Sequence, residues 1–111
     1  MDIVQNPTLQ QILRELQAGL AQLYGPRLKG LLLFGSHARG EATNDSDIDV
    51  AAILDDFDYA SREIDRSSSL IGELCLRYDC LIGLVPIRER AWLTRQDPFF
   101  MNVRREAISL S

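Results

Sequence analysis

Apolar and polar residues follow two distinct patterns along this chain, and the longer-period pattern predicts two helices. From Leu9 to Tyr24, apolar side chains recur every three or four residues, which is the spacing of one face of an α-helix. Either Asn6, directly before a proline, or Thr8, with Gln11 three residues later, can cap the start of this helix. Gly25, followed by a second proline, ends it. A similar pattern over residues 59–77 predicts a second long helix.

Continuous apolar runs predict three strands, over residues 28–34, 47–54 and 79–87. The helix between the second and third strands is about 19 residues, or roughly 28 Å, long. It must cross back over the sheet, which favours a third strand parallel to the second. Pro86 marks an edge position or the exit of the third strand. Short helical segments are expected in the remainder, residues 89–110.

This order of elements predicts an α/β (α+β) fold in which helices flank a small, mixed, three-stranded sheet. At 111 residues the chain is expected to form one domain, residues 1–111. Cys75 and Cys80 have no second pair of cysteines to complete a metal site, so we expect two small buried apolar residues.

The charge distribution narrows the classes of partner. The net charge is −4, with −6 over residues 1–86 and +2 over residues 87–111. An acidic body argues against binding along a nucleic-acid backbone.

No apolar run is long enough to span a membrane, and the N-terminus shows no signal segment, so a cytoplasmic location is expected.

Two carboxylates on the second strand are the main candidates for chemistry. Asp47 and Asp49 are two residues apart, so in a strand they share one face, roughly 6.5–7 Å apart. Two carboxylates at this spacing can bind divalent ions, and hard oxygen ligands favour Mg²⁺ or Mn²⁺ over zinc. The alternative is an exposed polar strand face, although adjacent like charges are unfavourable without a cation.

A glycine-serine pair precedes these carboxylates at the end of the first strand. Gly35 lets the backbone approach a ligand closely, and Ser36 offers a hydroxyl at the start of a turn or helix that suits an anion. Arg39 either pairs with a terminal phosphate or braces Asp47 and the turn. Asp79, expected to open the third strand, is either a third carboxylate at the edge where Asp47 lies or a solvated aspartate.

The motif Gly35-Ser36-His37-Ala38-Arg39-Gly40, followed by Ser46-Asp47-Ile48-Asp49-Val50, resembles the signature of the nucleotidyltransferase superfamily with the DNA polymerase beta palm fold. The size of the chain resembles that of the minimal members, the MNT-domain proteins. The resemblance implies that Gly35 and Ser36 contact the phosphates of a Mg²⁺–nucleoside triphosphate, ATP or another NTP, and that Asp47 and Asp49 bind the metal. In that family a third acid lies between apolar residues on the third strand, and Asp79 fits this local pattern.

The resemblance implies two alternative functions. The first is transfer of a nucleoside monophosphate such as AMP to a hydroxyl of a protein or small molecule, with release of pyrophosphate. The second is a nucleotide-binding antitoxin or regulatory subunit that acts mainly through a helical HEPN-type partner, as minimal members often do. The sequence leaves open the acceptor, the base preference and the oligomeric state, including a homo-oligomer.

Overall fold

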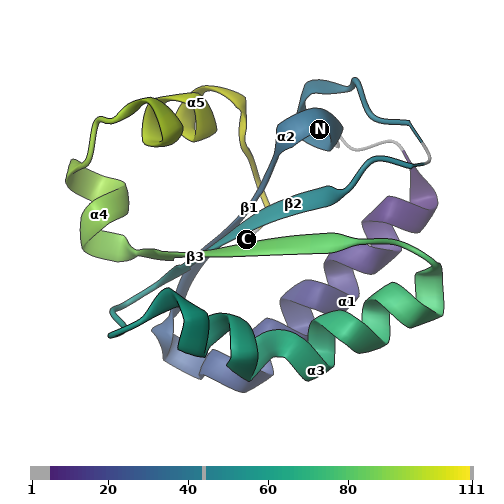
Figure 1. Ribbon diagram of the computed structural model, residues 1–111, viewed down its shortest axis with the longest axis horizontal. Coiled ribbons are helices and arrows are strands. Elements are labelled where there is room, and N and C mark those ends of the chain that lie inside the picture. Colours follow the sequence, from purple (N-terminus) through teal and green to yellow (C-terminus); the bar gives the residue numbers. More distant parts are fainter. Residues whose placement is uncertain (1–5, 44, 111) are drawn as a thin grey trace.

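A computed structural model describes residues 6–43 and 45–110 of the chain. Figure 1 shows a central sheet with helices on both faces. In chain order the elements are α1 (Pro7–Tyr24), the 3-10 helix η1 (Gly25–Arg27), β1 (Leu28–Phe34), α2 (Gly35–Arg39), β2 (Ile48–Leu54), α3 (Ala60–Tyr78), β3 (Ile82–Arg88), α4 (Glu89–Thr94), α5 (Pro98–Glu106) and β4 (Ile108–Ser109).

The sheet has the strand order β3-β2-β1-β4. β2 and β3 are parallel, as the long crossover helix predicts, and β1 is antiparallel to both β2 and β4. Pro86 lies on the edge strand β3, where a residue without an N–H is tolerated. The prediction of three strands was wrong, because β4 adds a fourth. It has only two residues, too few to show a periodic pattern in the sequence.

Each face of the sheet has its own core, because side chains alternate between the faces. Val50 and Ala52 pack with α1 and α3 on one face. Ala51 and Ile53 pack with residues of α4 and α5 on the other. In Figure 1, α1 and α3 lie below the sheet, and α2, α4 and α5 lie above it. The continuous apolar run of β2 is therefore explained by cover on both sides.

Helix α1 begins and ends as its sequence predicts. The Oδ1 atom of Asn6 accepts hydrogen bonds from the N–H groups of Thr8, at 2.9 Å, and Leu9, at 3.2 Å. At the other end, Gly25 has a φ of +56°, a conformation that favours glycine. In residues 6–43 and 45–110, no helix has the combination of length and hydropathy needed to span a membrane.

Candidate functional site

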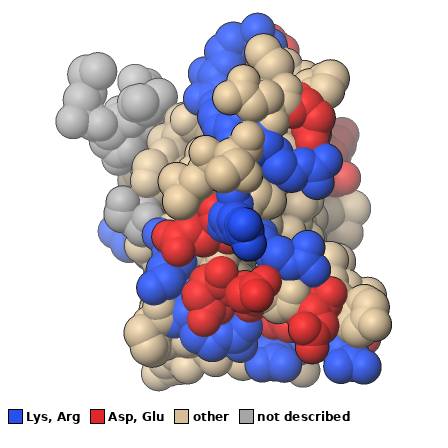
Figure 2. All heavy atoms as spheres, turned by 90° about the vertical axis from the view of Figure 1, so that its left-hand side faces the viewer, with Lys and Arg blue, Asp and Glu red and all other residues tan. Residues whose placement is uncertain are grey.

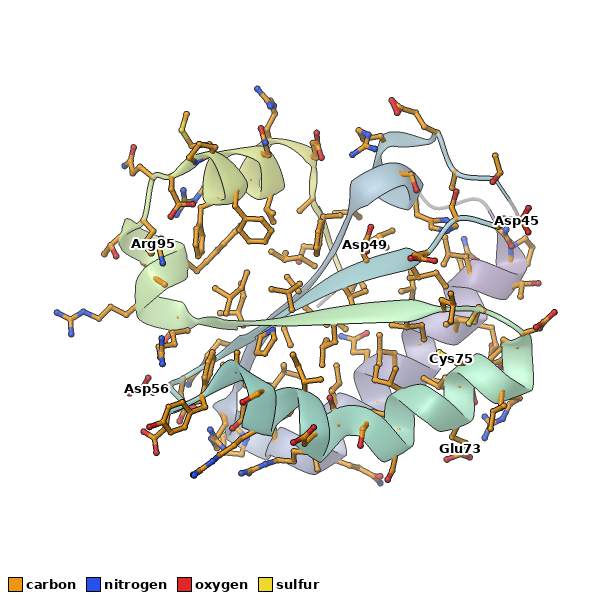
Figure 3. All side chains as sticks on the ribbon, viewed as in Figure 1. Asp45, Asp49, Asp56, Glu73, Cys75 and Arg95 are labelled. Atoms are coloured by element: carbon orange, nitrogen blue, oxygen red, sulfur yellow. The ribbon has the colours of Figure 1, made fainter. Side chains whose placement is uncertain are left out.

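Asp47 and Asp49 lie where β2 begins. Asp49 is the second residue of β2, is half-buried, and lies on the same strand face as Ala51 and Ile53. Figure 3 shows it on the side of β2 opposite α1 and α3. Asp47 precedes the strand by one residue and is exposed. Burial and the nearby charge of Asp47 raise the pKa of Asp49 above its usual range.

The backbone of Gly35 lies very close to the Asp49 carboxylate. Gly35 has a φ of +74°, and a Cβ added to it would lie 2.3 Å from Oδ2 of Asp49 and 3.2 Å from its Cγ. A side chain at this position therefore cannot coexist with the observed Asp49 conformation. The glycine at the start of the motif is required both by its backbone conformation and by its contact with the acidic residue.

The neighbouring strand has a glycine beside Asp49 on its other side. In the parallel register of β2 and β3, Asp49 pairs with Gly83. A Cβ built on Gly83 would lie 3.4 Å from Oδ1 of Asp49, an ordinary van der Waals contact. Gly83 stands between two apolar residues, Ile82 and Leu84. It thus occupies the position on the third strand from which a side chain would reach Asp49.

Asp79 is not the first residue of the third strand, and that boundary prediction was wrong. Helix α3 continues to Tyr78, Asp79 follows it in the left-handed conformation with a φ of +52°, and β3 begins only at Ile82. The apolar run starts at Cys80, but residues 79–81 connect the end of α3 to β3, so the strand begins only after them. Asp79 nevertheless lines a cavity of about 260 Å³ together with Asp47.

The structure therefore brings the acidic residues together in two pairs. Asp47 influences Asp49 electrostatically, and Asp47 shares a cavity with Asp79. Within residues 6–43 and 45–110, no group of three or more His, Cys, Asp or Glu side chains is arranged to hold one metal ion. The Asp49 carboxylate lies next to the glycine turn, and hard divalent cations prefer such oxygen ligands.

The remaining motif residues lie on α2 and the loop that follows it. Ser36 is half-buried in the first turn of α2. Nε2 of His37 lies 3.3 Å from the carbonyl oxygen of Ser46, which links α2 to the segment before β2. Arg39 donates hydrogen bonds to Glu41 and Glu106, each at 3.2 Å. Its guanidinium thus connects α2 to the end of α5, and neither of these two hydrogen bonds involves Asp47.

The arginine-rich C-terminal quarter does not form a continuous basic surface. Figure 2 shows acidic side chains beside basic ones in both the upper and the lower part of the face that carries α4. Nε of Arg88 lies 3.3 Å from Asp56, and Arg95 forms an ion pair with Asp97. Surface pairs of this kind contribute little to stability. They do, however, reduce the local positive potential that a long nucleic-acid backbone would require.

The sequence did not predict the place of two residues, Gly83 and Cys80, at the site. The position of Gly83 beside Asp49 depends on the β2–β3 register, which the apolar runs do not specify. Cys80 lines the cavity shared by Asp47 and Asp79, and also a second cavity of about 260 Å³ that includes His37. Cys75 and Cys80 are partly rather than fully buried, and Cys80 packs against the core formed with α1 and α3, so the expectation of two buried apolar residues is met only in part.

Comparison with known proteins agrees with this arrangement. Residues 13–96 match the family model described as "Nucleotidyltransferase domain". A Methanocaldococcus jannaschii relative named "Putative protein adenylyltransferase MJ0604" is 38% identical over 77 residues, covering 68% of this chain and 70% of the relative. A second protein of that organism, MJ1379, carries the same description and is 42% identical over 53 residues, covering 48% of this chain and 51% of the relative.

Solved structures share the fold. A toxin–antitoxin structure with AMP-PNP superposes with a TM-score of 0.62 at 22% identity, covering 89% of this chain and 72% of that one. A structure of a tri-AMPylated Shewanella oneidensis HEPN toxin with its MNT antitoxin gives a TM-score of 0.55 at 21% identity, covering 92% of this chain and 71% of that one. These neighbours confirm the expected fold, in which helices pack on a small mixed sheet of the polymerase beta-like type.

Proposed function

This chain belongs to the nucleotidyltransferase domain family, and on that premise we propose that it transfers AMP from a Mg²⁺–ATP complex to a hydroxyl group. The acceptor is a protein or a small molecule, and pyrophosphate is released. One observation carries the proposal: a Cβ on Gly35 would lie 2.3 Å from Oδ2 of Asp49, so the glycine backbone and the strand carboxylate approach each other closely. The glycine turn thus lies beside the strand carboxylate, an arrangement that suits a phosphate site next to a metal site.

The residues present fit a hard divalent cation, Mg²⁺ or Mn²⁺. Asp47 and Asp49 supply carboxylate oxygens, which are the ligands that such ions prefer. Burial and the charge of Asp47 raise the pKa of Asp49, so a bound cation would offset an existing repulsion. We propose that these two residues hold the ion. When bound, a divalent ion supplies charge neutralisation for the triphosphate and for the developing charge of the transition state.

The chain's own residues would orient the nucleotide. We propose that Gly35 and Ser36 contact the phosphates, through a close backbone approach and a hydroxyl respectively. Arg39 would contribute a guanidinium to a phosphate by exchanging one of its ion pairs with Glu41 or Glu106. Both pairs are partly solvent-exposed, so the exchange is inexpensive. The placement of Asp79 beside Asp47 is compatible with contact to an acceptor at the open edge of the sheet.

A second function is favoured by Gly83. The strand position that faces Asp49 has no carboxylate, and Asp79 lies three residues before β3, at the end of α3. A site with two carboxylates can bind Mg²⁺–nucleotide and still lack a group to remove the proton of the acceptor hydroxyl. In that case the chain would act as a nucleotide-binding antitoxin or regulatory subunit, with a HEPN-type helical protein as partner, because solved neighbours include such complexes.

The decisive experiment incubates the protein with ATP labelled at the α-phosphate, Mg²⁺ and a cell lysate. Label that becomes attached to an acceptor supports AMP transfer, and the variants Asp47→Asn and Asp49→Asn should each abolish it. Asp55→Asn is the matched control, because Asp55 lies just beyond the other end of β2 and pairs with Arg27. An unchanged rate in either site variant would refute the proposal.

Nucleotide binding without labelled acceptor would support the regulatory function. The variant Gly83→Asp then separates the two functions further, because it places a third carboxylate beside Asp49. A gain of label transfer in this variant would show that the wild-type chain lacks only this group. If the wild-type protein binds no nucleotide in the presence of Mg²⁺, both functions are refuted.

A further inference from the structure

Two cysteines meet at the C-terminal end of α3, next to the sheet edge that carries Asp47. Cys75 lies in the last turn of α3, and Cys80 follows the left-handed residue Asp79. The N–H of Cys80 donates a hydrogen bond to the carbonyl oxygen of Cys75 at 3.1 Å, and the N–H of Asp79 donates to the same oxygen. This six-to-one hydrogen bond, together with a positive φ just after the helix, describes a Schellman-type helix end.

A Schellman-type end brings the side chains of the two residues joined by its longer hydrogen bond into contact. In most helices this contact is between two apolar residues. Here the two residues are Cys75 and Cys80. The Cys80 thiol donates a hydrogen bond to the carbonyl oxygen of Leu74 at 3.9 Å, and burial, together with the nearby Cys75, raises the pKa of this thiol. Both thiols are free and partly exposed, so a small oxidant in solution can reach them. The backbone conformation therefore holds two accessible cysteines next to each other.

We propose that Cys75 and Cys80 are a redox modification site, at which a low-molecular-weight disulfide such as oxidised glutathione converts the two thiols into a disulfide. One cysteine thiolate attacks the small disulfide, which forms a mixed disulfide and releases one thiol. The second cysteine attacks the protein-bound sulfur of that mixed disulfide and displaces the other thiol. The two protein sulfurs are oxidised, the small disulfide is reduced to two thiols, and a dithiol reductant reverses the reaction.

The disulfide would stabilise the connection between α3 and the candidate site. Cys80 is followed directly by Leu81, whose carbonyl oxygen accepts a hydrogen bond from the N–H of Ile48 at 2.8 Å. Ile48 stands between Asp47 and Asp49. A covalent bond at Cys80 restricts the freedom of this connecting segment, so the Leu81–Ile48 hydrogen bond would open less often. Oxidation would thus make the start of β2 more rigid.

The test uses the full chain and oxidised glutathione. After reaction and blocking of free thiols, trypsin cleaves at Arg77, between the two cysteines, and yields peptides 67–77 and 78–88. We expect these peptides to be disulfide-linked in the oxidised monomer and to separate on reduction. The link should form about tenfold faster in the folded protein than in denaturing urea, because the helix end holds the two cysteines next to each other. Two separate glutathione adducts, or equal rates in both conditions, would overturn the proposal.

Amide hydrogen exchange tests the effect on the site without any nucleotide. Exchange of the Ile48 amide should be about fivefold slower in the oxidised protein than in the reduced protein. The variants Cys75→Ser and Cys80→Ser should form no linked peptide and show no such difference. Linked peptides with unchanged exchange at Ile48 would refute the coupling to the start of β2. Because no nucleotide is used, this result does not depend on the proposed transferase activity.

Discussion

The close approach of Gly35 to Asp49 allows a sharp comparison of two glycine-to-alanine variants. Gly35 and Gly40 flank α2 and both have a φ of +74°. A Cβ on Gly40 would meet no atom within 4 Å, whereas a Cβ on Gly35 would lie 2.3 Å from Oδ2 of Asp49. Gly40→Ala therefore reports the backbone strain alone. Gly35→Ala reports the same strain together with the displacement of the carboxylate.

The magnitudes follow from the geometry. A left-handed conformation costs an alanine roughly 1–2 kcal/mol, which is the expected loss of unfolding free energy in Gly40→Ala. In Gly35→Ala, Oδ2 of Asp49 must also retreat by 1.1 Å to reach ordinary contact at 3.4 Å, since 3.4 − 2.3 = 1.1. Moving a side chain this far from its rotamer adds roughly 0.5–1.5 kcal/mol. A displacement of about 1 Å in a reacting site reduces function by about 100-fold.

Urea unfolding and the rate of label transfer from α-labelled ATP measure the two effects separately. Gly35→Ala should lose more stability than Gly40→Ala and about 100-fold in transfer rate, while Gly40→Ala should transfer label within about twofold of the wild-type rate. In an Asp49→Ala background the extra stability cost of Gly35→Ala should disappear, because the clashing oxygen is gone. Equal losses of stability and equal transfer rates in the two single variants would refute the reasoning.

Three further predictions concern stability. The Tyr24 hydroxyl donates to Oε1 of the buried Glu63 at 3.0 Å, so Tyr24→Phe should cost roughly 1–3 kcal/mol of unfolding free energy in urea. Burial first and then this hydrogen bond raise the pKa of Tyr24 from 10.0 to about 12. The contribution of Tyr24 to the free energy of unfolding should be fully present below pH 10.0 and lost as the pH rises through about 12. If Tyr24→Phe loses the same stability at alkaline pH, Tyr24 is not its cause. Asp49→Asn should stabilise the metal-free protein at pH 7, because it removes a partly buried charge that Asp47 repels. The gain should shrink as the pH falls, because the raised pKa of Asp49 lets the wild-type carboxylate take up a proton. A destabilised Asp49→Asn protein would contradict this reasoning. Gly72, where a Cβ meets no atom within 4 Å, should tolerate alanine with a gain of roughly 0.5–1 kcal/mol in the free energy of unfolding, measured by heat or urea. A loss of stability would contradict the open space at this position of α3.

The local pattern of the sequence was sufficient to predict most elements of the fold. The apolar spacing from Leu9 to Tyr24 identified α1, and the apolar run after Asp47 identified β2, whose start at Ile48 is one residue later than predicted. Helix caps, turns and side-chain alternation are set by neighbouring residues, so a sequence can specify them without knowledge of the tertiary structure. The parallel pairing of β2 and β3 was also predictable, because a helix the length of α3 must recross the sheet.

What the tertiary structure alone decided is the register between distant segments. It placed Gly83 beside Asp49, left Asp79 at the end of α3, and joined the two-residue β4 to β1. It also brought Cys75 and Cys80 next to each other at the end of α3, each partly exposed. Apolar runs show that strands exist, but a shift along a strand keeps the same run of residues and changes every neighbour. Packing of the whole chain selects among these registers, and the chemistry of the site depends on that selection.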